Sequence, residues 1–336
     1  MNSSVKNIAP LDNLLSVTPQ NFSETALAVF QFQYQHNPVY HQYCQALHID
    51  NTKIDSIAKI PFLPVAFFKT HTITTTPFKP AVIFESSGTT QTINSKHFVK
   101  DTGLYEQSFL AAFNLFYGNI KDWCILALLP SYLERNNSSL VMMANTLIQK
   151  SQHAQSDFYL NDLNKLHHTL LQVEKQQQKT LLIGVTFALL DFAEQYPLQL
   201  QHTTIMETGG MKGRREEIIR QQVHHILCAA FNLNKIHSEY GMTELLSQAY
   251  SKGDGIFNCP PWMKVLAREE DDPLSVQIAD KNKIINGAVN IIDLANIYSC
   301  SFIATDDAVK LYPDESFEIL GRLDNSDVRG CSLLAL

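Results

Sequence analysis

Hydrophobic positions in the first sixty residues recur at helical spacing. The apolar positions that follow Asn21 are Leu27, Phe30, Tyr34 and Tyr40. Their separation is close to the 3.6-residue period of an amphipathic helix. The Pro-Phe-Leu-Pro run at 61–64 ends this pattern, because proline breaks helices and extends the residue before it. The sequence therefore predicts an N-terminal helical region over residues 1–60.

Between residues 61 and 262, short apolar runs alternate with longer amphipathic segments. The runs that predict buried strands are 81–84, 124–129, 180–185 and 203–206. The segments with helical period and length are 101–117, 138–150, 161–179 and 214–232. This alternation favours a layered α/β fold, an α/β core in which helices pack on the faces of mixed β-sheets.

After Met263 the pattern changes to short β-rich segments separated by Asp, Asn and Gly. These segments are 265–268, 275–278, 289–293, 301–304 and 317–320. They predict a smaller, more antiparallel subdomain over residues 263–320, followed by a hinge-like motif and tail at 321–336.

Composition and charge exclude several classes of function. Hydrophobic residues make up 45% and charged residues 18% of the 336 residues, as in soluble globular proteins. A net charge of −7 offers no attraction to nucleic acid or anionic lipid. No segment reaches the roughly 18 uncharged apolar residues that insertion into a membrane requires. Six cysteines without metal-ligand spacing, and no signal peptide, predict a reduced cytoplasmic protein whose thiols are mainly buried.

The first candidate for chemistry is the segment Ser86, Ser87, Gly88, Thr89 and Thr90, which follows a predicted strand. Hydroxyl groups and a flexible glycine in a tight turn can converge on a polyphosphate. The segment lacks the frame of a Walker loop. By itself it fits a phosphate loop and a hydroxyl-rich turn equally well.

A second motif, Tyr240-Gly241-Met242-Thr243-Glu244, is predicted to form a short strand-to-helix turn. An aromatic ring can stack on a nucleobase, a threonine can donate to a phosphate, and a carboxylate can hold Mg²⁺. The alternative for Thr243 and Glu244 is a simple helix N-terminus.

A third motif comprises Thr305-Asp306-Asp307 and, further on, Gly321-Arg322-Leu323-Asp324. An aspartate can accept both ribose hydroxyls, and an arginine can complement the charge of a nucleotide. Three such motifs in this order predict a nucleotide-binding enzyme more strongly than any one of them.

In this order the motifs resemble the adenylating superfamily of acyl-CoA synthetases, peptide-synthetase adenylation domains and firefly-type luciferases. Four further segments resemble the acyl-protein synthetases of bacterial bioluminescence, the LuxE family. They are 60–64 with Phe68-Lys69, 129–135, 207–214 and 329–333. The resemblance runs from about Ile60 to the C-terminus. It implies an adenylate-forming lobe and an ATP-dependent acid–thiol ligase.

The resemblance also implies the cofactors ATP and Mg²⁺ and a role for each motif. Residues 86–90 would hold the β- and γ-phosphates of ATP. Thr243 would contact the α-phosphate, and Glu244 would coordinate Mg²⁺. The familiar glycine after the phosphate loop is Gln91 here, which implies a stiffer loop.

The nucleoside would be held by the remaining positions. Gly209 and Gly210 would form a backbone wall between adenine and the acyl group, and Tyr240, followed by Gly241, would stack on adenine. Asp307 would bind the ribose hydroxyls and Arg322 would lie near the ribose and phosphate. Because the familiar Thr-Gly-Asp reads Thr305-Asp306-Asp307, either aspartate could meet the ribose.

Most superfamily members continue beyond the Gly-Arg motif into a mobile domain whose lysine binds the α-phosphate. The sequence ends at Leu336, so we expect that lysine to be missing from its usual place. Lys96 and Lys212 are candidate substitutes, and the alternative is that both are surface lysines beside loops.

Cys331 is the candidate acceptor of the acyl group. The nine residues from Arg322 to Cys331 can span at most roughly 30 Å, and Arg329 favours the nucleophilic thiolate. LuxE-type enzymes are acylated on a cysteine close to the C-terminus, which Cys331 matches. The alternative is an unreactive cysteine in a frayed tail.

The leading hypothesis is activation of a carboxylic, expected to be fatty, acid to acyl-AMP and transfer to Cys331. An acyl-reductase, an acyl carrier protein or coenzyme A could then accept the acyl group. The alternatives are an aryl- or short-acyl ligase for coenzyme A or a carrier protein, and a nucleotide-binding module without catalysis.

Overall fold

A computed structural model describes residues 14–86, 93–130, 135–209 and 218–323. Within these ranges one 13-stranded sheet runs through the molecule in the order β12-β11-β13-β14-β15-β10-β9-β8-β7-β6-β4-β5, with β1 paired to β14. The parallel strands of this sheet are β4 (Cys124–Leu128), β5 (Asp157–Phe158), β6 (Thr180–Val185), β7 (Thr203–Thr208) and β8 (His237–Tyr240).

The antiparallel part of the sheet follows β8 in sequence. Its strands are β9 (Ala249–Ser251), β10 (Phe257–Asn258), β11 (Met263–Arg268), β12 (Val276–Gln277), β13 (Ile285–Asp293), β14 (Phe302–Leu311) and β15 (Phe317–Arg322). Strand β1 (Leu63–Pro64) adds to β14 in parallel. A separate hairpin pairs β2 (Val82–Glu85) with β3 (Lys96–Val99).

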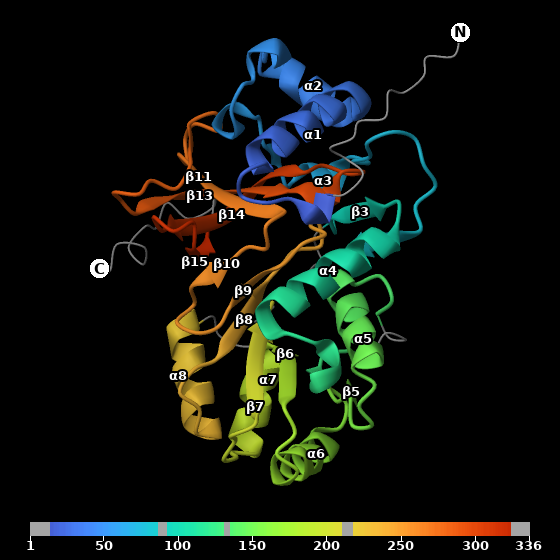
Figure 1. Cartoon of the computed structure of the whole chain (residues 1–336), viewed down its shortest axis with the longest axis vertical. Coiled ribbons are helices and arrows are strands. Elements are labelled where there is room, and N and C mark those ends of the chain that lie inside the picture. Colours follow the sequence, from blue (N-terminus) through green and yellow to red (C-terminus); the bar gives the residue numbers. More distant parts are fainter. Residues whose placement is uncertain (1–13, 87–92, 131–134, 210–217, 324–336) are drawn as a thin grey trace.

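Helices pack around the parallel strands and over the antiparallel end (Figure 1). They are α1 (Phe22–His36), α2 (Pro38–Ala46), α3 (Phe67–Thr70), α4 (Thr102–Tyr117), α5 (Ser139–Ser151), α6 (Leu163–Lys175), α7 (Thr186–Gln195) and α8 (Arg220–Phe231). Helix α4 packs against α5, and α7 packs against α8. In the view of Figure 1, α4 and α5 lie on one side of β6–β8 and α8 lies on the other.

Side-chain caps mark the start of three helices, α4, α5 and α6. Asp101, Ser138 and Asp162 each accept a backbone N–H from the first turn of α4, α5 and α6. Helix α8 ends at Asn232, whose backbone is left-handed with φ 52°. The central strands β4 and β6 are predominantly apolar on both faces, and every residue of each is buried.

The predicted N-terminal helices cover the antiparallel end of the sheet (Figure 1). Gln33 donates from Nε2 to the Ile297 carbonyl at 2.9 Å, and Asn37 donates from Nδ2 to the Ser299 carbonyl at 2.9 Å. The rings of Phe30 on α1 and Phe302 on β14 lie 6.3 Å apart. These contacts join residues more than 260 positions apart in sequence.

The α/β fold class is confirmed, and the predicted strands are present with small shifts at their ends. Three predictions differ from the structure. Helix α6 ends at Lys175 because Gln177 is left-handed, α7 lies where no helix was expected, and β14 is a ten-residue strand that continues past Ala304. The sheet crosses the boundary expected at residue 262 through β9, β10 and β15. The division of the chain into domains at 60, 262 and 320 therefore stays a prediction.

Candidate active site

The predicted motifs meet where the parallel part of the sheet gives way to the antiparallel part. Strand β8 pairs in parallel with β7 and antiparallel with β9. Gly209 directly follows β7, and Tyr240 is the last residue of β8. In open α/β sheets, ligands bind outside the carboxyl ends of strands at such a change in topology.

No helix begins at Thr243 and Glu244, so the expectation of a strand-to-helix turn was wrong in its second half. Residues 241–248 instead form a turn that leads into β9. The alternative interpretation of Thr243 and Glu244 as a helix N-terminus is thereby excluded. The backbone carbonyls of this turn are bound by side chains from elsewhere: His97 Nδ1 lies 2.9 Å from the Thr243 oxygen, and Asn296 Nδ2 lies 2.7 Å from the Glu244 oxygen.

Glu244 is 5% exposed and lies beside the base of the predicted phosphate loop. Ser86 and Ser95 close that base: Ser86 N donates to the Ser95 carbonyl at 3.1 Å, and Ser95 N donates to Ser86 Oγ at 2.9 Å. Burial raises the pKa of Glu244, while a hydrogen bond from Ser95 and the charges of Lys69 and Arg322 oppose that rise. The loop base, the carboxylate and two cations therefore share one site.

Asp307 connects Tyr240 to Arg322. The Tyr240 hydroxyl donates to Asp307 Oδ2 at 2.8 Å, and Asp307 faces Arg322 across the β14–β15 ladder. Burial raises the pKa of Asp307, and the bond from Tyr240 and the charge of Arg322 oppose the rise. Asp306 is half-buried, with Oδ2 4.0 Å from Arg322 Nη2. Of the two aspartates, Asp307 is the one joined to the tyrosine.

Tyr240 is 9% exposed, and its ring packs edge-on against two phenylalanines. The centroids of Phe257 and Phe317 lie 6.0 and 5.8 Å from its own. A Cβ at Gly241 would overlap with the carboxylate of Glu239, so any other residue there would require that side chain to shift. Gly209 has φ 74°, a left-handed conformation that favours glycine.

A second buried carboxylate, Glu207, lies one strand away at the end of β7. Its Oε1 is 3.1 Å from Arg220 Nε and 3.5 Å from His224 Nε2, and its Oε2 accepts from Thr186 Oγ1 at 3.1 Å. Burial by itself would raise the pKa of Glu207, but His224 and Arg220 outweigh it and lower the pKa to about 2. Arg220 also donates to the Ile319 carbonyl at 3.2 Å and so joins β7 to β15.

Sequence reasoning missed four residues of this site: Lys69, Ser95, His97 and Asn296. Only Lys69 carried a signal, since it belongs to the family-like segment around Phe68. The others became visible through contacts with the 241–248 turn. Among the predicted residues, those outside the described ranges are Ser87, Gly88, Thr89, Thr90, Gly210, Lys212 and Cys331.

Lys96, a candidate substitute for the missing lysine, is exposed at the start of β3, opposite Glu85 in the hairpin. His237, at the start of β8, has its Nδ1 3.2 Å from the Tyr117 hydroxyl. Burial lowers the pKa of His237 to about 4, which favours a neutral ring packed against tyrosine.

The described cysteines are poor nucleophiles. All five are free thiols: Cys44, Cys124, Cys228, Cys259 and Cys300. Burial raises the pKa of Cys124 to about 11 and the pKa of Cys44, Cys259 and Cys300 to about 12. Burial also raises the pKa of Cys228. Because the thiolate is the reactive form, burial disfavours acyl transfer most clearly at Cys44, Cys259 and Cys300.

Within the described ranges, no helix is long and apolar enough to cross a membrane. The same residues include no group of three or more His, Cys, Asp or Glu side chains arranged for a metal ion. Glu244 alone still fits Mg²⁺, which commonly takes one or two carboxylates and completes its shell with water and substrate phosphates.

The fold is that of the adenylate-forming ligases. The structure superposes on 2-hydroxyisobutyryl-CoA ligase, solved with 2-HIB-AMP and CoA, with a TM-score of 0.63 and 10% identity over 92% of this chain and 72% of that chain. For the ATP-bound MatB of Rhodopseudomonas palustris the TM-score is 0.53, at 16% identity over 73% of this chain and 49% of that chain.

The family follows from sequence. The family model described as acyl-protein synthetase, LuxE, matches residues 10–335, so the chain belongs to that family. The long-chain-fatty-acid–luciferin-component ligase of Vibrio harveyi is 23% identical over 96% of this chain and 92% of its own length. The prediction of a ligase of the acyl-protein synthetase type is confirmed.

Proposed function

We propose that this enzyme activates a fatty acid with ATP to an acyl-adenylate and transfers the acyl group to its own Cys331. The observation that carries the proposal is the meeting of Ser86, Glu244, Asp307 and Arg322 at the carboxyl ends of β7 and β8. Ser86 and Arg322 are 236 positions apart in sequence, and their proximity to Glu244 supports a shared nucleotide site.

ATP would lie with its phosphates between the base of the 86–90 loop and Glu244, and with its ribose at Asp307. Asp307 can accept from ribose hydroxyls because a carboxylate offers about four lone-pair positions and Tyr240 uses one. Arg322 and Lys69 would offset the negative charge that develops around the α-phosphate. Mg²⁺ bound at Glu244 would supply Lewis-acid polarisation of a phosphate oxygen.

The first step joins a carboxylate oxygen of the acid to the α-phosphorus of ATP and expels pyrophosphate. The second step joins the Cys331 sulfur to the acyl carbon, expels AMP and leaves a thioester. Because the thiolate is the attacking form, the thiol proton leaves before or during attack. The high pKa values of the five described cysteines support Cys331, which lies outside the described residues, as the acceptor.

A fatty acid is proposed because the Vibrio harveyi relative is named for a long-chain fatty acid. Acid-dependent exchange of pyrophosphate into ATP, measured over a panel of aliphatic and aromatic acids, tests this assignment. We expect long-chain acids to give the highest kcat/KM. A preference for short aromatic acids would contradict it, and tight ATP binding without exchange for any acid would reject catalysis.

Labelling tests the acceptor. After incubation with radiolabelled fatty acid and ATP, we expect the wild-type protein to carry label and Cys331→Ala to carry none, with pyrophosphate exchange unchanged. Cys228→Ala, which removes a partly exposed thiol on α8, is the matched control and should label normally. Full labelling of Cys331→Ala would exclude Cys331. Transfer of label to coenzyme A or an acyl carrier protein would identify the next acceptor.

A further inference from the structure

The turn that carries Thr243 and Glu244 is not built into a helix or a strand, so other groups must fix its backbone. Its carbonyls cannot find partners through a regular ladder. Two buried side chains hydrogen-bond these carbonyls instead. His97, from β3, binds the Thr243 oxygen at 2.9 Å, and Asn296 binds the Glu244 oxygen at 2.7 Å.

Asn296 has a fixed orientation. Its Nδ2 also donates to the Cys300 carbonyl at 2.9 Å, so both amide hydrogens face backbone oxygens. The amide cannot be flipped without losing both bonds, and its Oδ1 therefore remains an acceptor. Oδ1 is buried and has no hydrogen-bond partner among the described residues.

His97 has a fixed tautomer. Because the Thr243 carbonyl can only accept, His97 Nδ1 must carry the hydrogen, and in the neutral ring Nε2 is an acceptor. Nε2 is also buried and makes no hydrogen bond in the described part of the chain; its neighbour is the side chain of Asn296, which offers it an acceptor and no hydrogen. Two acceptors, from His97 and Asn296, are thus left where a group with two donors is needed. Buried acceptors that lack a partner destabilise the folded state.

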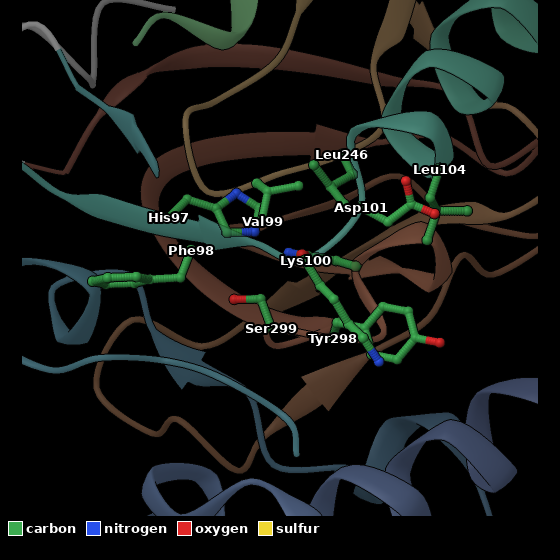
Figure 2. Close-up of a pocket in the computed structure, with 10 residues that line it drawn as sticks. His97, Phe98, Val99, Lys100, Asp101, Leu104, Leu246, Tyr298 and Ser299 are labelled. Carbon is green, nitrogen blue, oxygen red and sulfur yellow. The ribbon is translucent and has the colours of Figure 1, made fainter. Parts of the chain in front are cut away.

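A small cavity lies at these two side chains. Its volume is about 10 Å³, and His97, Asn296, Val99 and Leu246 are among the residues that line it. Figure 2 shows His97, Val99 and Leu246 at this cavity. A volume of about 10 Å³ is the least that holds one water molecule. One water has two hydrogens to donate, which matches the two acceptors.

We propose that His97, Asn296 and one water molecule between them form a clamp that positions Thr243 and Glu244 for reaction at the α-phosphate of ATP. The proposal rests on the proposed function and adds two positioning residues to it. The clamp binds the backbone oxygens of the turn and leaves the Glu244 carboxylate to the Ser95 hydrogen bond at the loop base. A shift of about 1 Å in such groups costs about 100-fold in rate.

Two substitutions at His97 separate positioning from bulk stability. In His97→Asn, the amide nitrogen takes the place of Nδ1 and can still donate to the Thr243 oxygen. In His97→Gln, the amide lies one bond further out, where Nε2 was, and that donor is lost. Both replace a buried ring by a smaller amide. Val99→Ala, on the same strand and lining the same cavity, is the control for a packing defect.

We expect His97→Gln to lower kcat for acid-dependent pyrophosphate exchange about 100-fold with KM for ATP changed less than about threefold. His97→Asn should retain kcat within about threefold, and Val99→Ala should leave it unchanged. Equal losses of kcat in His97→Asn and His97→Gln that follow their melting temperatures would overturn the positioning role.

Amide hydrogen exchange at residues 241–247 gives a readout that needs no catalysis. Amide exchange should accelerate in His97→Gln and stay slow in His97→Asn. Equal amide exchange rates in the two variants would reject the clamp, even if the wild type showed no pyrophosphate exchange activity. Absence of activity in the wild type with this pattern intact would reject the proposed function alone. A crystal structure should show one water within about 3.2 Å of both His97 Nε2 and Asn296 Oδ1. Without that water, the water's place in the clamp is refuted.

Discussion

Three carboxylates near the carboxyl ends of β7 and β8 form two sets with different surroundings: buried Glu207 by itself, and buried Glu244 with partly buried Asp307. Glu207 is paired with Arg220 and His224, which lower its pKa to about 2. Burial raises the pKa of Glu244 and Asp307, and nearby cations offset that only in part. The charge of Glu207 is therefore balanced by partners within the protein. The charges of Glu244 and Asp307 are balanced only in part, as is common for carboxylates in functional sites.

The largest expected effect comes from removing the charge of Glu244. Glu244→Gln should lower acid-dependent pyrophosphate exchange by about 10²–10³-fold, a loss typical of one group that stabilises developing charge. Its melting temperature should stay the same or rise, because an incompletely paired buried carboxylate disappears. A clear drop in melting temperature with normal exchange would place Glu244 among structural carboxylates and erase the contrast with Glu207.

The opposite result is expected at the paired carboxylate. Arg220→Met should lower the free energy of unfolding by about 3 kcal/mol, since it leaves Glu207 buried without its arginine and frees the bond to the Ile319 carbonyl. Exchange activity per folded molecule should change little. Denaturant unfolding measures the free energy of unfolding. Pyrophosphate exchange rates, divided by the active-site concentration from titration, measure the activity per folded molecule. Glu207→Gln with Arg220→Met should recover part of the lost stability.

The pH dependence of stability follows from the same pair. Because the pKa of Glu207 is lowered from 4.5 to about 2 on folding, its contribution to stability is present above about pH 4.5 and is lost as pH falls toward 2. Between pH 5 and pH 3 wild type should lose about 2 kcal/mol that Glu207→Gln does not lose. Urea unfolding of both proteins across this range measures the difference, and parallel curves would contradict the lowered pKa.

The contrast between the two sets also shows what the sequence could predict. Strand and helix periodicity predicted the α/β fold, and the resemblance identified Glu244, Asp307 and Arg322. The residues that set the charge and geometry around them came from distant segments without a local pattern. His97 and Asn296 lie 146 and 52 positions from the turn residues they bind. Helix α7 was missed because seven of its ten residues are buried, which leaves little amphipathic signal.

The smallest expected effects distinguish Asp307 from its tyrosine. Asp307→Asn should raise KM for ATP about tenfold, because the amide keeps only one of the two carboxylate oxygens for the ribose hydroxyls and the Tyr240 hydroxyl. Tyr240→Phe removes only the 2.8 Å bond and should raise KM about threefold or less, as expected for one hydrogen bond of net 0.5–1.5 kcal/mol. Initial rates at varied ATP measure both. If Tyr240→Phe raises KM for ATP as much as Asp307→Asn does, the hydrogen bond from Tyr240 that orients Asp307 matters more than the contact of Asp307 with the ribose.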